Sequence, residues 1–164
     1  MKTKRLTKLA LLTAAALILF VVELQIPSPV PIPGVKLGLA NVVTLFAVYK
    51  FKKGEAALLL LARILLGSVF AGSAMTLLYS LCGGGLCLAG MLLLKRVIPE
   101  DSMWITSMLG AVLHNVGQIA AAIAVTATPG LILYLPVLLV SGCIAGLFTG
   151  LCAGFVAKRN YLSL

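Results

Sequence analysis

The feature that most constrains this chain is its succession of long apolar runs, which recur from end to end with only short connections between them. An α-helix needs about 20 predominantly apolar residues to cross a bilayer. The 164 residues have room for six such helices and for no soluble domain beside them. We therefore predict a single integral membrane domain over residues 1–164, an all-α bundle of six transmembrane helices. The expected bounds are roughly 8–26, 36–50, 55–72, 74–94, 104–127 and 131–156.

The basic residues indicate how these helices are oriented. The formal net charge is +9, yet eleven of the thirteen Lys and Arg residues fall near the two ends of the chain or just after the second and fourth apolar runs. If six helices alternate, all these positions lie on one side, as the positive-inside rule requires of the cytoplasmic side. The charge therefore predicts a multi-pass protein of the bacterial cytoplasmic membrane with both termini inside. It points to a lipid bilayer as partner and not to nucleic acid.

A second set of polar residues lies within or beside the apolar runs. Such groups are costly in hydrocarbon unless they are paired or hydrated, so each is a candidate for function. His114 and Gln118 are four residues apart and share a helical face. Either an interhelical hydrogen-bond cluster or a ligand site would explain this set, and the sequence leaves both open. The candidate substrate-binding residues are Lys36, Asn41, Arg63, His114, Asn115 and Gln118.

The charges of this second set bear on the ligand. Glu23 is the one acidic residue placed toward the outer half, and the embedded basic groups outnumber it. This balance favours an anionic or zwitterionic ligand, with Arg63 making charge-assisted contacts to a carboxylate or phosphate. A structural ion pair between Arg63 and Glu23 is the alternative use of that arginine.

Small residues mark three places where helices can approach closely. Glycines at 142, 146, 150 and 154 form one face of the sixth helix, which packs either inside the chain or against another subunit. Glycines 83–85 either break the fourth helix, as at transporter sites, or permit a tight crossing. Ala10 and Ala14 form a small-residue pair on the first helix, suited to a docking surface or to internal packing. Pro136, early in the sixth run, predicts a bend there.

The connection between the first two helices has prolines at 27, 29, 31 and 33. Alternate prolines hold a chain extended, so this segment should be stiff. It is either a rigid linker that sets the direction of the second helix or a preformed lid over a ligand pocket, with Lys36 at its edge.

The inventory of reactive side chains does not support an enzyme. Asp101 is the single aspartate, so the carboxylate clusters that hold Mg²⁺ for phosphate chemistry cannot form. No P-loop is present, so any ATP hydrolysis would come from another chain. The four cysteines lack metal-site spacing and are expected to be packing residues. We predict no catalytic residues, no metal and no cofactor.

Three segments carry a resemblance to a known family: PIPGVKLGLANVVTLFA at 31–47, LLLLARILLGSVFAG at 58–72 and GAVLHNVGQ at 110–118. With them the chain resembles, over nearly its whole length, the Gx transporter family, also described as heptaprenyl diphosphate synthase component I. That family is grouped with the S components of energy-coupling factor (ECF) transporters. The resemblance implies a six-helix subunit that binds a micronutrient near its outer side, while a T subunit and two ATPases drive uptake. It also implies that Ala10 and Ala14 dock the T subunit.

Three functions therefore follow from the sequence. The first is the substrate-binding membrane subunit of an ECF-type importer for a small anionic or zwitterionic micronutrient or precursor. The second is a non-catalytic membrane subunit that supports quinone or flavin electron transfer. The third is a component of prenyl-diphosphate synthesis, although the aspartate-rich motifs of prenyl synthases are missing.

Overall fold

The computed structural model describes residues 3–26 and 38–159, and within those ranges the chain is helical and contains no strand. The predicted all-α fold with six helices is confirmed. Two short 3-10 helices, η1 (Glu100–Ser102) and η2 (Pro129–Tyr134), precede the last two α-helices. The α-helices are α1 (Thr3–Leu24), α2 (Asn41–Lys50), α3 (Lys53–Ala71), α4 (Ala74–Leu94), α5 (Met103–Thr126) and α6 (Leu135–Lys158).

The second helix is shorter than expected. Five of the described helices are long and apolar enough to cross a membrane, but α2 has only 10 residues. At 1.5 Å per residue it spans about 15 Å, or about half of the hydrocarbon layer. The expected helix over 36–50 is therefore wrong at its start, where Gly38 adopts a left-handed φ of 82° and a turn precedes Asn41. The prolines at 27–33 and Lys36 lie outside the described residues.

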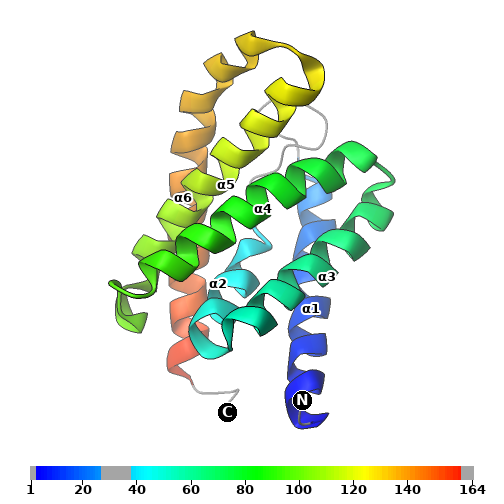
Figure 1. The fold of residues 1–164 in the computed structure, drawn as a ribbon. Helices are drawn as coiled ribbons and strands as arrows, with labels where there is room; N and C mark the ends of the chain where they lie inside the picture. The colour runs from blue at the N-terminus through cyan, green and yellow to red at the C-terminus, as the bar shows by residue number, and fades with distance from the viewer. Residues whose placement is uncertain (1–2, 27–37, 160–164) are drawn as a thin grey trace.

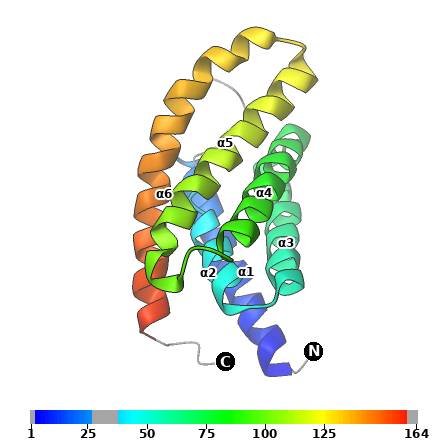
Figure 2. The same cartoon turned by 60° about the vertical axis from the view of Figure 1, so that its left-hand side comes forward.

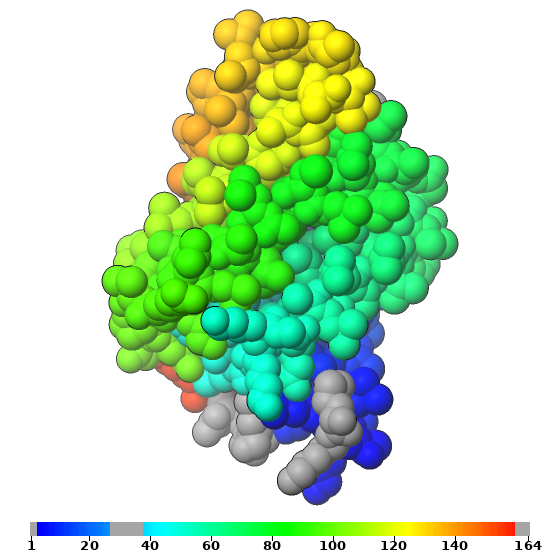
Figure 3. Space-filling view, in the orientation of Figure 1, coloured from blue at the N-terminus to red at the C-terminus, as the bar shows by residue number. Residues whose placement is uncertain are grey.

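The short helix forms the centre of the bundle. It contacts each of the other five α-helices, and seven of its ten residues are buried. Around it, α5 packs most extensively against α4 and α6, while α1 packs mainly against α3 (Figures 1 and 2). The space-filling view shows α3, α4 and α5 covering one face, with the α5–α6 hairpin rising above it (Figure 3). A helix that does not span the membrane is thus enclosed by five that can.

The basic residues gather at one end of this bundle. The start of α1, the end of α6 and the α2–α3 and α4–α5 connections all lie in the lower half of Figure 1, opposite the α5–α6 hairpin. The Lys95 ammonium group donates to the carbonyl oxygens of Val48 (2.6 Å) and Tyr49 (3.4 Å) near the end of α2. Lys50, at the end of α2, also forms an ion pair with Glu100 at the start of η1. The predicted grouping of charge is observed, and its cytoplasmic orientation stays a prediction.

The glycines of α4 permit close crossings and do not break the helix. The helix runs continuously through residues 83–85. A Cβ atom on Gly83 would lie 2.8 Å from the carbonyl oxygen of His114 on α5, and one on Gly84 would lie 3.1 Å from Ile64 on α3. A Cβ atom on Gly85 would meet no other described part of the chain within 4 Å beyond the backbone of its own helix. The tight-crossing interpretation is therefore confirmed.

The glycine face of α6 packs within the chain, against α5. A Cβ atom on Gly146 would lie 2.8 Å from the Cα atom of Met108, and one on Gly150 would meet the backbone of Trp104. The cause expected for a bend at Pro136, the loss of a helical hydrogen bond, does not apply. The helix begins at Leu135, so this proline occupies the first turn, where its missing N–H removes no helical hydrogen bond. The apolar segment before it forms η2 instead of the first turns of α6.

Candidate functional site

The predicted polar residues that can be described are all buried, and they come from three helices around the start of α2. Asn41 is the first residue of α2, Arg63 lies in the middle of α3, and the other three lie in the middle of α5. Each is at most 5% exposed. The five are Asn41, Arg63, His114, Asn115 and Gln118. The sixth predicted residue, Lys36, lies outside the described residues.

Two glycines bring neighbouring backbones against His114. A Cβ atom on Gly38 would lie 2.7 Å from Nδ2 of Asn41 and 3.3 Å from Nε2 of His114. A Cβ atom on Gly83 would lie 3.1 Å from Nδ1 of His114 and 2.8 Å from Cγ of Gln118. The turn before α2 and the middle of α4 therefore enclose one polar face of α5. The structure brings Asn41, His114 and Gln118 together, as a shared site requires.

Arg63 and Glu23 complete this neighbourhood but make different bonds. The charge of Arg63 acts on Glu23 and on His114, so the three groups lie within electrostatic range. The Glu23 carboxylate accepts hydrogen bonds from the backbone N–H groups of Gly38 and Leu39, the second at 3.0 Å. It thereby joins the end of α1 to the turn before α2. Nε and Nη2 of Arg63 have no hydrogen-bond partner among the described residues. The ion pair with Glu23, which was the alternative use of this arginine, therefore does not involve these two nitrogen atoms.

The cluster retains a large unused hydrogen-bonding capacity. Buried polar groups in proteins are nearly always hydrogen-bonded, and each exception calls for an explanation. Here the exceptions concentrate around one region of the bundle. The side-chain atoms without a partner among residues 3–26 and 38–159 include Nε and Nη2 of Arg63, both amide atoms of Asn41, Oγ1 of Thr44, Nδ1 of His114, Oδ1 of Asn115 and Oε1 of Gln118.

Asn115 has a partly structural role. Its Nδ2 donates to the carbonyl oxygen of Leu138 on α6, and Gly142 gives it room there. Its neighbour His114 instead faces the turn before α2 and the middle of α4. Adjacent helical positions are about 100° apart, which explains why the two side chains meet different helices. Asn115 therefore ties α5 to α6, and only its oxygen lacks a partner in the part of the chain that the structure describes.

Glu23 and Thr44 belong to this region but were not among the predicted site residues. Thr44 is fully buried on α2, one turn after Asn41, yet nothing in its sequence context separates it from an ordinary packing threonine. Glu23 could have been found, because it is the acidic residue nearest the proline-rich connection. Its role in holding the turn before α2 depends on the path of the chain, which the sequence does not specify.

Ala10 and Ala14 lie on the surface and not in the interior of the chain. Both are exposed, and they line a hollow of about 430 Å³ between α1 and α3. The walls are apolar and include Leu58 and Leu66 from α3. Internal packing, the alternative drawn from the sequence, is therefore excluded for these two alanines. A docking role remains a prediction.

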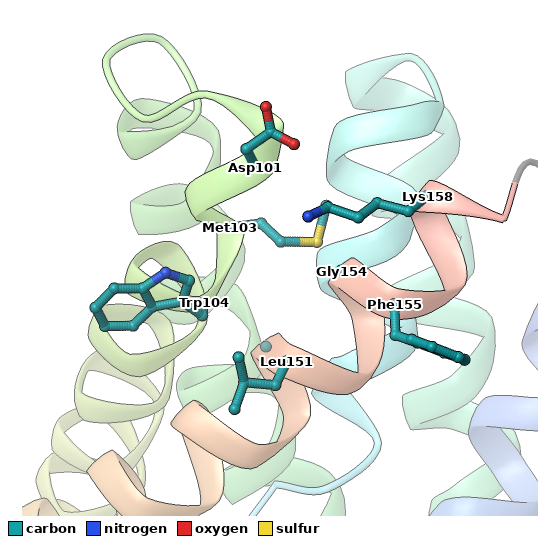
Figure 4. A pocket seen from close by; sticks show the side chains of 8 residues that line it. Asp101, Met103, Trp104, Leu151, Gly154, Phe155 and Lys158 are labelled. Atoms are coloured by element: carbon teal, nitrogen blue, oxygen red, sulfur yellow. The ribbon is translucent and has the colours of Figure 1, made fainter.

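A further hollow of about 220 Å³ lies at the end where the basic residues gather (Figure 4). Asp101 and Trp104 line it on one side, and Leu151, Phe155 and Lys158 on the other. None of the predicted binding residues contributes to it. Among the described residues, no three His, Cys, Asp or Glu side chains are grouped so that they could hold a metal ion.

Comparison with known proteins gives one match. Residues 12–156 match the model of a family described as heptaprenyl diphosphate synthase component I. No curated protein and no solved structure matches the chain.

Proposed function

The chain belongs to the heptaprenyl diphosphate synthase component I family, and from its buried polar cluster we propose that it is the substrate-binding membrane subunit of an ECF-type importer. Its five long apolar helices make it a multi-pass membrane protein. The proposed location is the bacterial cytoplasmic membrane. The proposed substrate is a small anionic or zwitterionic micronutrient or precursor, bound at the cluster around the start of α2.

The unused hydrogen-bonding groups of the cluster carry this proposal. A buried polar group without a partner costs about 1–3 kcal/mol, and a charged one more. An interhelical packing cluster would be expected to satisfy its own members, as Ser107 and Thr149 do between α5 and α6 at 3.0 Å. Arg63, Asn41 and Gln118 instead leave buried groups that have no partner among the described residues. A ligand with complementary groups would recover that cost and would bind selectively.

The proposed partners are a T subunit and ATPase subunits, which would supply the energy that this chain has no motif to obtain. The exposed face around Ala10 and Ala14 supports such a partner. Small side chains let two helices approach closely in a membrane, where hydrophobicity gives no preference for protein over lipid. The hollow beside them between α1 and α3 would receive larger side chains of the partner helix.

The family description favours a second candidate, a non-catalytic membrane subunit associated with prenyl-diphosphate or quinone metabolism or with flavin-dependent electron transfer. Catalysis by the chain itself is disfavoured because the chain has only four acidic residues, too few for the aspartate-rich motifs of prenyl synthases. The two in the connection before α5, Glu100 and Asp101, lie at the end where the basic residues gather, away from the polar cluster. We propose that the chain is not an enzyme.

Purification from native membranes distinguishes these candidates. The chain, carrying an affinity tag, would be extracted in mild detergent, and its partners identified by mass spectrometry. An importer subunit should co-purify with another membrane protein and with ATPases. Enrichment of a prenyl synthase catalytic chain or of a redox protein, without ATPases, would refute the importer proposal in favour of the second candidate.

A further inference from the structure

From the groups left unpartnered in the cluster we infer that the ligand is a small zwitterion, with one carboxylate bound by Arg63 and with N–H donors that face the amide oxygens of Asn41 and Gln118. This inference rests on the proposed substrate-binding function and specifies its substrate class. It follows from the geometry of the guanidinium group, from the acceptors of the same buried cluster and from the charges of Arg63 and Glu23.

The free atoms of Arg63 define the shape of the anionic group. Nε and Nη2 lie on one edge of the planar guanidinium and direct two parallel N–H bonds the same way. Both are without a partner among the described residues, and the side chain is 4% exposed. This edge matches the two oxygens of a carboxylate in a bidentate pair. The free edge of Arg63 can therefore bind one planar anionic group.

The amide side chains require donors from the ligand. Neither amide atom of Asn41 has a partner among the described residues, so the side chain offers an acceptor and a donor whichever way the amide is turned. Within residues 3–26 and 38–159, Oε1 of Gln118 has no partner either. Carbonyl oxygens accept hydrogen bonds and cannot donate them. A ligand that carried only acceptors would leave these oxygens unsatisfied, so it must also bring N–H or O–H groups. An ammonium or a protonated ring nitrogen satisfies them and balances the carboxylate.

The charges of the described residues favour a ligand without net charge. Arg63 and Glu23 lie within electrostatic range and have opposite charges. Within a membrane, an excess charge is costly to bury. With a zwitterion bound, the net charge of Arg63, Glu23 and the ligand stays near zero. A prenyl diphosphate would add at least two negative charges, and its apolar chain would offer nothing to the oxygens of Asn41 and Gln118.

Retention of labelled metabolites tests this substrate class. Detergent-solubilised chain on an affinity resin would be incubated with an isotope-labelled small-molecule extract of bacteria, washed and eluted for mass spectrometry. The retained compound should contain a carboxyl group and an amine or ring N–H, both identifiable by chemical derivatisation. We expect Arg63→Gln to reduce its retention at least tenfold. The control Arg96→Gln changes an exposed arginine in the connection between α4 and α5 and should retain as much as the wild type.

The possible results distinguish a wrong substrate class from a wrong substrate-binding function. If the wild type retains no compound, the proposed substrate-binding function is overturned, and the inference with it. If it retains a phosphate ester, a diphosphate or any compound without a carboxylate, only the zwitterion is overturned. Equal retention by Arg63→Gln would also overturn it. Since Arg63→Gln could impair folding, Asn41→Leu provides a second test, and circular dichroism and gel filtration would show which variants keep the helical fold.

Discussion

The α4–α5 crossing places a backbone of one helix against a glycine of the other, and replacing Gly117 tests how tightly the site is held. A Cβ atom at this position would lie 2.7 Å from the carbonyl oxygen of Cys82 and 2.9 Å from the Cα atom of Gly83. These are backbone atoms, which cannot rotate away as a side chain can. Gly117→Ala must therefore move the two helices apart by about 0.7 Å to restore ordinary contact.

The expected cost follows from two opposing terms. Overpacking of this kind costs about 1–3 kcal/mol, while alanine gains up to about 1 kcal/mol over glycine in a helix. Because the opposing atoms belong to the backbone, the overpacking cost should lie in the upper part of this range, about 2–3 kcal/mol. The net loss should then be about 1–2 kcal/mol, or a fall in Tm of about 2–8 °C for a chain of this size. Because His114 and Gln118 flank Gly117 and pack against Gly83, the same shift should weaken ligand binding.

Gly85→Ala is the matched control, since Gly85 lies on α4 two residues beyond Gly83 and a Cβ atom there would meet no described residue within 4 Å outside its own helix backbone. Its Tm should stay the same or rise slightly, by the helix propensity of alanine. Thermal unfolding in detergent micelles, followed by circular dichroism at 222 nm, compares the two variants. If Gly117→Ala were as stable as the wild type, the close packing derived for α4 and α5 would be refuted.

Three further changes test other parts of the structure. Glu23→Gln removes the negative charge that accepts hydrogen bonds from the N–H groups of Gly38 and Leu39, and should destabilise the turn before α2 by about 1–3 kcal/mol. Hydrogen exchange at these two amides should become faster, and unchanged exchange would contradict the two hydrogen bonds. Ala14→Trp places a large side chain on the exposed small-residue face of α1 and should reduce co-purification of the proposed partners at least tenfold. Ala89→Trp, on an exposed face of α4, should leave it unchanged. Equal amounts of partner recovered with both variants would refute the docking role of α1. Lys50→Ala should change the free energy of unfolding by no more than about 1 kcal/mol, because its pair with Glu100 is partly exposed; a larger loss in chemical denaturation would show that this ion pair is more than a surface contact.

Much of the fold follows from the sequence because a membrane imposes simple rules. Apolar runs long enough to cross, with basic residues at alternate connections, gave six helices and a common end for both termini. The burial of Arg63 and His114 was also predictable, since polar groups in such helices avoid lipid by facing the bundle. The glycine spacing of α6 predicted a packing face, though not that α5 would be its partner.

What the sequence did not provide depends on backbone turns and on contacts between distant residues. The start of α2 is set by the positive φ of Gly38 and by Glu23, fifteen positions earlier in the chain. Hydropathy continues through this point, so it predicts a longer helix. The split between His114, which faces α2, and Asn115, which bonds to α6, depends on the rotation of α5 about its axis. No local pattern determines that rotation.

The most direct test of the central claim is native mass spectrometry of the chain released intact from detergent after isolation from cells. If the polar cluster is a substrate site, the wild type should carry one small molecule per chain, and Arg63→Gln should lose it while Arg96→Gln keeps it. A wild type that appears only at its own mass, or that carries the same molecule after Arg63→Gln, would contradict the account.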